Sequence, residues 1–295
     1  MSSSIEGPSM TAVGTSTAGD GVARLLLRYV LLAYGISWLL FAPAPSVGGA
    51  AGWVAVAGAF GPAVAAGLVV RTSGGSLRGW LRPLLRWRVP VRYWVYALGL
   101  PVVLFGSVGG VLAVAGEQVH LDRLGPATDW IVFFILVWLP TGAGEELGWR
   151  GLALDLLQAR HSPLAATVLL GLIWGVWHLP FYRDAISVLG VALTAFYYTW
   201  LWNRTGSLLL CAILHGAVNA SKGALVFVGG GPVAPAMLGV VFVGSLALVV
   251  LTRGRLGSTT ARSWWLSGWP TWACVGDRPA EQKMPGALMP VSGSG

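Results

Sequence analysis

Residues 129–154 read DWIVFFILVWLPTGAGEELGWRGLAL, an apolar stretch that carries two adjacent glutamates and an arginine in its second half. A helix of about 20 apolar residues crosses the hydrocarbon core of a bilayer, so this stretch is long enough to span a membrane. An ionisable side chain inside lipid is costly, and its presence there favours a functional role. The stretch therefore predicts a membrane helix that contains a polar site.

The rest of the chain has the same character. Of its 295 residues, 55% are hydrophobic and only 10% are charged, whereas an average soluble domain has about 25% charged residues. We expect an all-α, multi-pass membrane bundle of about eight transmembrane helices. Seven spans are the alternative, because only Pro180, Arg183 and Asp184 interrupt residues 164–202. Besides 129–154, the candidate spans are 25–43, 51–70, 93–115, 164–182, 185–202, 206–228 and 233–252.

Composition divides the chain into three parts. Residues 1–23 are rich in Ser, Gly, Thr and Ala and contain no Lys or Arg, so we expect a disordered tail rather than a cleaved signal peptide. Residues 24–254 form the transmembrane domain. Residues 255–295 contain many Gly, Pro and Ser residues, and we expect a disordered cytoplasmic tail there.

The net charge of +8 comes from arginines that lie mostly in the loops between apolar stretches. This placement favours membrane lipids as partners and argues against nucleic acid. Because positive loops stay in the cytoplasm, we expect a cell-membrane protein with both termini cytoplasmic. One loop decides this orientation, and residues 72–92 within it alternate Leu and Arg as a helix lying on the membrane surface would. Its arginines are Arg71, Arg78, Arg82, Arg86, Arg88 and Arg92.

The first polar cluster is Glu145-Glu146-Leu147-Gly148-Trp149-Arg150. On a helix, Glu146 and Arg150 share a face at i and i+4 and can form an ion pair. Glu145 is rotated by about 100° from Glu146, so it is left for acid–base chemistry. A buried structural ion pair would explain Glu146 and Arg150 equally well, but it would not explain Glu145.

Two further clusters lie on later spans. Trp174 and His178 are spaced i and i+4, as are His215 and Asn219. Taken alone, a histidine on an apolar helix is more often a core residue, and a His–Asn pair more often links packed helices. Together, three polar sets in a dry membrane core need partners, and they can satisfy one another by meeting.

These residues carry a resemblance. The pattern EExxxR at 145–150, an aromatic residue four positions before His178, and HxxxN at 215–219 are similar to the CPBP family of intramembrane endopeptidases. That family comprises type II CAAX prenyl endopeptidases and bacteriocin-processing or immunity (Abi) proteins. The resemblance covers about residues 130–225, with a protease-like core at 129–228. Trp174 departs slightly from the family, where Phe is commoner.

The resemblance implies a peptide hydrolase that cuts a peptide or lipid-anchored protein substrate within the membrane. It implies that Glu145 and His178 activate water, and that His215 and Asn219 stabilise the oxyanion. Glu146, Arg150 and Trp174 would support the site. Glu145, His178 and His215 could alternatively hold a zinc ion, since three such ligands suit catalytic zinc. The cofactor expectation is therefore either none or zinc.

Two other classes of function stay open. Buried Glu, His and Arg also build proton relays in transporters, although the two halves of this chain lack matching broken helices. A non-catalytic immunity or partner-binding protein could keep the same scaffold. A Glu145→Gln variant separates the classes, because it abolishes cleavage or proton-coupled flux and spares a pure binder.

Overall fold

The structure is a computed structural model that describes residues 14–42, 51–120, 125–225 and 232–258. Throughout this described part the chain forms helices and no strand, which confirms the expected all-α fold. The protein is a multi-pass membrane protein, because five of its helical stretches have the length and apolar composition to cross a bilayer. These are Asp20–Phe41, Val91–Val114, Ala127–Gln158, Ala185–Thr205 and Val233–Leu251.

Three shorter apolar helices, Val56–Thr72, Pro163–Trp177 and Leu208–Lys222, fall in the remaining predicted stretches. Each is shorter than the roughly 20 residues that an untilted span needs. The total of eight spans therefore stays a prediction.

In chain order the first elements are α1 (Gly14–Phe41), α2 (Ala51–Gly58), α3 (Gly61–Thr72), α4 (Leu77–Leu81), η3 (Arg82–Leu85), α5 (Val91–Val114) and α6 (Ala127–Val137). They are followed by η5 (Trp138–Ala143), α7 (Gly144–Gly148), η6 (Trp149–Ala153), α8 (Leu154–Gln158), α9 (Pro163–Trp177), α10 (Leu179–Tyr182), α11 (Ala185–Thr205), α12 (Leu208–Leu225) and α13 (Val233–Leu251).

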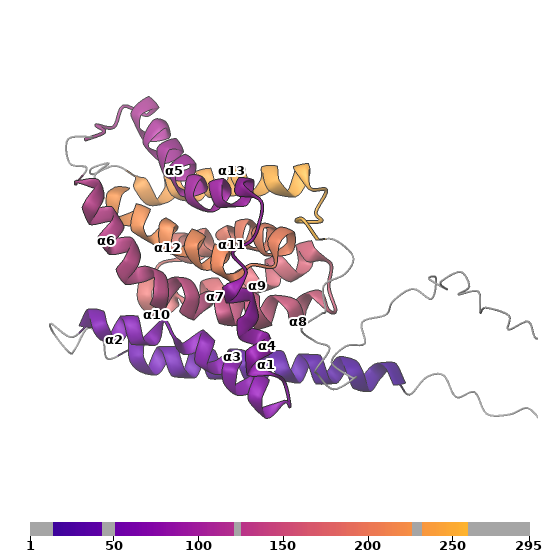
Figure 1. Ribbon diagram of the computed structural model, residues 1–295. Helices are drawn as coiled ribbons and strands as arrows, with labels where there is room; N and C mark the ends of the chain where they lie inside the picture. The colour runs from indigo at the N-terminus through magenta and orange to yellow at the C-terminus, as the bar shows by residue number, and fades with distance from the viewer. Residues whose placement is uncertain (1–13, 43–50, 121–124, 226–231, 259–295) are drawn as a thin grey trace, which may run out of the picture.

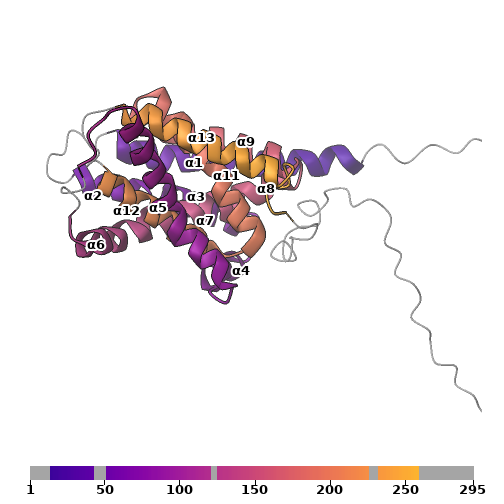
Figure 2. The same cartoon turned by 90° about the horizontal axis from the view of Figure 1, so that it is seen from above.

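The helices stack in layers around α7, α11 and α12. Figure 1 shows α1 and α3 on one side of the bundle, with α5 and α13 on the opposite side; Figure 2 looks from above, so that α13 and α1 overlap in the view. Helix α12 contacts η5, α5, α6 and α11, so it lies at the centre of the bundle. The polar clusters of α7, α9 and α12 are thereby enclosed by other helices.

Residues 164–202 form the separate helices α9, α10 and α11 rather than one continuous helix. The chain reverses after α10, where Arg183 adopts a left-handed conformation with φ of 57° and Asp184 caps α11 by accepting a hydrogen bond from the Ser187 N–H. Helices α9 and α11 then pack closely. A Cβ on Gly171 would lie 2.4 Å from the Ala192 carbonyl oxygen, which explains why a small residue is needed at this crossing.

The structure describes only part of each predicted tail, and the part that it describes of the first tail is helical. Helix α1 already begins at Gly14, inside the predicted tail 1–23, and Val22 and Leu25 are buried. The apolar side of this helix therefore extends beyond the predicted span, while residues 1–13 lie outside the described residues. At the other end Leu256 is buried, and its carbonyl accepts a 3.0 Å hydrogen bond from Asn203 Nδ2. Residues 259–295 of the second tail lie outside the described residues.

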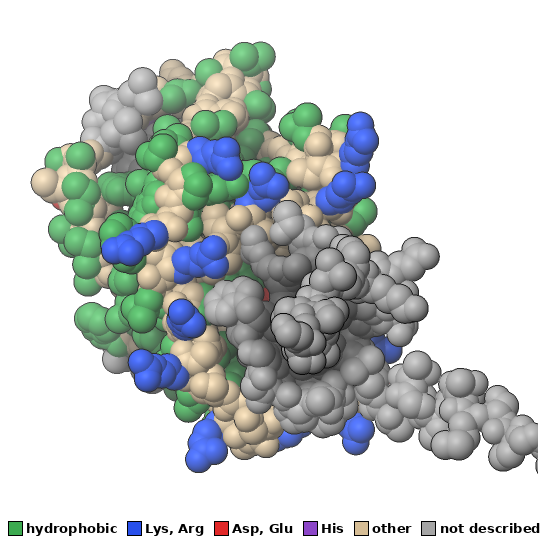
Figure 3. All heavy atoms as spheres, turned by 45° about the vertical axis from the view of Figure 1, so that its right-hand side comes forward, with side chains coloured by type: hydrophobic (Ala, Val, Ile, Leu, Met, Phe, Trp, Pro, Cys, Tyr) green, Lys and Arg blue, Asp and Glu red, His purple; other side chains and the backbone are tan. Residues whose placement is uncertain are grey.

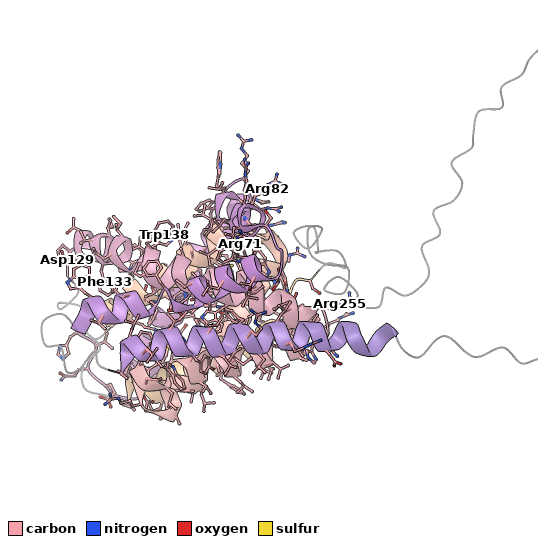
Figure 4. The ribbon with its side chains drawn as sticks, turned by 90° about the horizontal axis from the view of Figure 1, so that it is seen from below. Arg71, Arg82, Asp129, Phe133, Trp138 and Arg255 are labelled. Atoms are coloured by element: carbon pink, nitrogen blue, oxygen red, sulfur yellow. The ribbon has the colours of Figure 1, made fainter. Side chains whose placement is uncertain are left out.

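Arginines gather at one end of the helices. Figure 3 shows Lys and Arg side chains spread across the end of the bundle that it brings forward. In Figure 4, Arg71, Arg82 and Arg255 lie toward that end, whereas Asp129 and Phe133 lie toward the other. The predicted surface segment contributes the short helices α4 and η3 to the arginine-rich end. Its large exposed apolar residues are Leu77, Leu81, Leu85, Trp87 and Val91.

Candidate active site

The two adjacent glutamates lie in a helix that changes its winding on either side of them. Helix α7 is flanked by two π turns, η5 and η6, within the continuous helical stretch Ala127–Gln158. Pro140 falls in the first π turn, where its missing N–H fits a break in the regular hydrogen-bond ladder. Single π turns inside α-helices are frequent at functional sites. Here every residue of α7 is buried, so both glutamates face the interior of the bundle.

The predicted pair between Glu146 and Arg150 is confirmed. Arg150 Nη1 donates to Glu146 Oε1 at 2.9 Å, and neither side chain has any exposed surface. The guanidinium lies between two aromatic rings, 4.4 Å from the centroid of Trp174 and 4.5 Å from that of Tyr198. Such stacking is a favourable environment for a buried, weakly hydrated guanidinium. Arg150 thus neutralises one carboxylate of the Glu145–Glu146 pair, which we call the dyad, and is itself held in place.

His215 connects the two carboxylates. Its Nδ1 lies 2.9 Å from Glu146 Oε1, and its Nε2 lies 3.8 Å from Glu145 Oε1. Because a carboxylate paired with arginine can only accept, Nδ1 carries the hydrogen in the bond to Glu146. The second nitrogen, Nε2, is then presented toward Glu145. His215 on α12 therefore lies between the two glutamates on α7.

Glu145 also contacts the second cluster. Trp174 Nε1 on α9 donates a 2.8 Å hydrogen bond to Glu145 Oε2. The other oxygen, Oε1, accepts no hydrogen bond from the residues that the structure describes. The three predicted clusters consequently meet, with Glu145 touching both Trp174 and His215 and keeping one oxygen for chemistry.

His178 lies in an aromatic setting at the end of α9, one turn after Trp174. Its Nδ1 is 3.0 Å from the Trp174 carbonyl oxygen, which can only accept, so Nδ1 carries the hydrogen and Nε2 the lone pair. Its ring meets the Trp177 ring edge-on, with 4.7 Å between the ring centroids, and stacks on the Tyr182 ring, with 5.4 Å between the centroids. Among the described residues no ion pair joins His178 to Glu145, and the joint activation of water by these two residues stays a prediction.

Asn219 lies one turn beyond His215 on α12 and is half-buried. Its Nδ2 donates to Thr141 Oγ1 at 3.0 Å, and Thr141 in turn donates to the Val137 carbonyl at 2.7 Å. The amide is therefore oriented by the π turn η5, and its second N–H stays available for another acceptor. Sequence reasoning missed Thr141, whose hydroxyl four residues before Glu145 is the signal that could have found it.

The three candidate zinc ligands do not form a ligand set. In the parts of the chain that are described, no three His, Cys, Asp or Glu side chains gather closely enough to hold a metal ion. His178 and His215 each use one nitrogen on a protein acceptor, the Trp174 carbonyl and the Glu146 carboxylate. A metal-bound histidine usually makes such a bond with its other nitrogen, so these contacts do not themselves argue against a metal. What the described residues lack is a gathered set of the three ligands that catalytic zinc needs.

Tyr29 and Tyr198 complete the wall around the dyad, and neither was singled out by the sequence motifs. Tyr29 on α1 is fully buried and meets Trp149 edge-on at a centroid distance of 5.5 Å. Tyr198 on α11 packs against His215 at 5.6 Å as well as against Arg150. Both lie outside the polar clusters in sequence, so only the folded bundle brings them to the site.

Comparison with known proteins bears on the same segment. Residues 127–221 match the family model described as type II CAAX prenyl endopeptidase Rce1-like. This segment of the chain is similar to that family. The match confirms the resemblance to the CPBP family and nearly coincides with the predicted core at 129–228. All three polar clusters lie inside the Rce1-like segment, whereas Tyr29 lies outside it.

A curated relative supports the same assignment. Over 55 residues the chain is 47% identical to the protein named CAAX prenyl protease 2 from Methanococcus maripaludis. The aligned stretch covers 18% of this chain and 20% of that protein. The match therefore spans only about a fifth of that protein's length.

Proposed function

We propose that this protein is an intramembrane endopeptidase that hydrolyses a peptide bond of a membrane-associated peptide or lipid-anchored protein. One observation carries the proposal: Glu145, buried in a membrane bundle, is held by Trp174 on one oxygen and faces His215 with the other. The Rce1-like match of the same segment supports a protease. We further propose a cell-membrane location with cytoplasmic termini, which the arginines at one end of the bundle support.

In the proposed reaction Glu145 acts as the general base. Its Oε1 takes a proton from a water molecule while the water oxygen bonds to the substrate carbonyl carbon. His178 is proposed to hold the same water through the lone pair of Nε2. The carbon–nitrogen bond then breaks as Glu145 returns the proton to the amine nitrogen. Carboxylic acid and amine products result, so atoms and charges balance without any further reactant.

Stabilisation of the oxyanion is assigned to α12. The proposed donors are the second N–H of Asn219 and the Nε2–H that His215 has when both of its ring nitrogens are protonated. The two residues lie on one face of α12, spaced i and i+4. Removing one such donor typically lowers kcat about 10²–10³-fold. Glu146 and Arg150 hold His215 at Nδ1 and so keep its other nitrogen directed at the reacting atoms.

The test is peptide cleavage by purified, detergent-solubilised protein, followed by mass spectrometry. Wild type is compared with Glu145→Gln and with Glu117→Gln, a matched change outside the site, on a farnesylated C-terminal peptide and on membrane-proximal peptides. Cleavage by wild type and Glu117→Gln but not by Glu145→Gln supports the proposal. A chelator arm decides whether a metal takes part, because activity that survives chelation needs none.

The other two classes predict different results. A transporter would give proton flux in proteoliposomes that Glu145→Gln abolishes, with no cleavage of any peptide. A binding or immunity protein would give neither activity and would tolerate the substitution. Folded wild-type protein that cleaves no peptide in the panel would overturn the proposed endopeptidase for these substrates.

A further inference from the structure

A groove runs along the outside of the bundle between α5 and α13. The two helices contact each other on the side away from α1 and α3 (Figure 1), and Tyr197 of α11 lines the groove with them. The volume of the groove is about 700 Å³, within the range of about 300–1,000 Å³ that small-molecule sites have. Its lining includes no residue of the three polar clusters, so the groove is separate from the proposed active site.

One face of α5 forms a wall of this groove. The lining residues of α5 include five that follow one another at intervals of three or four, as one face of a helix does: Tyr96, Leu100, Val103, Ser107 and Val111. They span roughly 22 Å at about 1.5 Å per residue. One leaflet supplies only about 15 Å of a hydrocarbon core about 30 Å thick. The groove is therefore long enough for an acyl chain.

The two tyrosines of the groove turn their polar ends away from it. Tyr96 OH donates to the Tyr197 carbonyl at 3.4 Å, and Tyr197 OH donates to the Val241 carbonyl at 3.1 Å. Because both hydroxyls have partners in the protein, the rings present mainly carbon to the groove. The lining therefore suits a hydrocarbon chain.

The same face of α5 carries a cation where the groove ends. Arg92 precedes Tyr96 by four residues, so the two side chains are neighbours on the helix surface. Arg92 Nη2 donates to Tyr93 OH at 3.4 Å, and Arg204 Nε of α11 donates to the same oxygen at 3.3 Å. Both arginines are exposed, and within the described ranges no ion pair joins either of them to a carboxylate. Two cations are thus held together on one phenol oxygen.

This pair of arginines has the chemistry of a phosphate site. Guanidinium groups bind phosphate with paired hydrogen bonds, and an anion between two cations relieves their mutual repulsion. Trp200 packs beside them, with its ring centroid 4.6 Å from that of Tyr96 and 5.9 Å from that of Tyr93. Tyr and Trp rings are enriched at the depth of lipid headgroups. The end of the groove at Tyr96 is therefore suited to a headgroup.

We propose that the groove between α5 and α13 is a binding site for an anionic phospholipid. One acyl chain lies along α5, and the phosphate is held by Arg92 and Arg204. The apolar length of the groove favours a whole lipid over a free phosphate, and the two cations favour an anionic headgroup over a zwitterionic one. The site does not depend on the proposed endopeptidase function.

The first test compares two lipids that share their acyl chains. Purified protein in neutral detergent is titrated with dioleoyl phosphatidylglycerol or dioleoyl phosphatidylcholine, and native mass spectrometry measures the bound fraction. We expect Kd to be about tenfold lower for phosphatidylglycerol, as charge-assisted hydrogen bonds would give. Arg92→Gln should remove most of this preference. Arg71→Gln is the matched control, because it removes the same charge from an exposed position on α3, across the bundle, and should keep the preference.

The second test fills the groove. Ala247 of α13 is exposed and lines it, so Ala247→Phe places a ring where the acyl chain is proposed to lie. Leu246→Phe puts the same ring on the adjacent exposed position, outside the groove lining, and is the control. Ala247→Phe should raise Kd for phosphatidylglycerol about tenfold and Leu246→Phe should leave it unchanged. Equal melting temperatures without lipid check that both variants fold as wild type does.

Three results would overturn the proposal. In the first, wild type binds the two lipids equally well. In the second, Arg71→Gln weakens binding as much as Arg92→Gln does, which would indicate the general charge of the arginine-rich end. In the third, glycerol phosphate displaces the lipid at equal concentration and Ala247→Phe has no effect, which would indicate a site for phosphate alone.

Discussion

His215 lies between the two adjacent glutamates, with Nδ1 2.9 Å from Glu146 Oε1 and Nε2 3.8 Å from Glu145 Oε1. One imidazole therefore links the carboxylate that is neutralised by Arg150 to the carboxylate that is proposed to act as base. The orientation of the ring depends on Glu146, and the orientation of Glu146 depends on Arg150. A substitution that breaks the Glu146–Arg150 pair should therefore also change the position of His215 relative to Glu145.

The first prediction concerns Arg150→Met. The change removes the guanidinium between Trp174 and Tyr198 and leaves Glu146 as a buried, uncompensated charge. Breaking such a pair typically costs about 3–5 kcal/mol. We expect a clear loss of stability in thermal or denaturant unfolding in detergent. The double variant Arg150→Met with Glu146→Gln should recover part of the loss, and a double variant as unstable as the single one would contradict this account.

The second prediction uses two glycines with opposite surroundings. A Cβ at Gly148 would lie 2.4 Å from Tyr29 OH and 2.7 Å from the Pro62 carbonyl oxygen, whereas a Cβ at Gly109 would meet nothing within 4 Å. Gly148→Ala should therefore force α7 away from α3 and cost about 1–3 kcal/mol, as overpacking does. Gly109→Ala should be neutral or slightly stabilising, because alanine favours a helix. Equal melting temperatures for the two variants would show that the α3–α7 contact is looser than described.

The sequence predicted the contacts within one helix better than the contacts between helices. Spacing of i and i+4 gave the Glu146–Arg150 pair and placed Trp174 beside His178, because local helix geometry alone decides these distances. The apolar stretches likewise gave the all-α membrane fold, since hydrophobic length is readable without tertiary structure.

The contacts between helices could not be predicted from the sequence. The bond from Trp174 to Glu145 and the position of His215 between the glutamates depend on how α7, α9 and α12 rotate against one another. The π turns that flank α7 shift that rotation, and Pro140 is their one sequence signal.

The third prediction concerns Trp174→Phe. Phenylalanine keeps an aromatic ring beside Arg150 but removes the indole N–H that holds Glu145 Oε2. Loss of a hydrogen bond to a carboxylate typically costs 1.5 kcal/mol or more, so we expect kcat to fall about tenfold with little change in KM. Trp38→Phe is the matched control, because Trp38 also donates an indole hydrogen bond, to the Trp177 carbonyl at 3.0 Å. A loss of activity that is the same in both variants would point to packing rather than to positioning of Glu145.

The last prediction tests which end of the bundle faces the cytoplasm. Ser207 at the start of α12 donates to the Arg86 carbonyl, and the helix then carries Lys222 away from this arginine-rich end by roughly 22 Å at about 1.5 Å per residue. Arg82 and Asp129, both exposed, lie toward opposite ends of the molecule (Figure 4).

With Cys211 and Cys274 replaced, Arg82→Cys should react with an impermeant maleimide only in inside-out vesicles, and Asp129→Cys only in intact cells, because arginine-rich loops stay in the cytoplasm. Lys222→Cys should behave as Asp129→Cys does, because α12 carries Lys222 away from the arginine-rich end. Labelling of Arg82→Cys in intact cells would reverse the proposed orientation. Labelling of all three variants from one side would contradict the prediction that the stretches 129–154 and 206–228 both cross the bilayer.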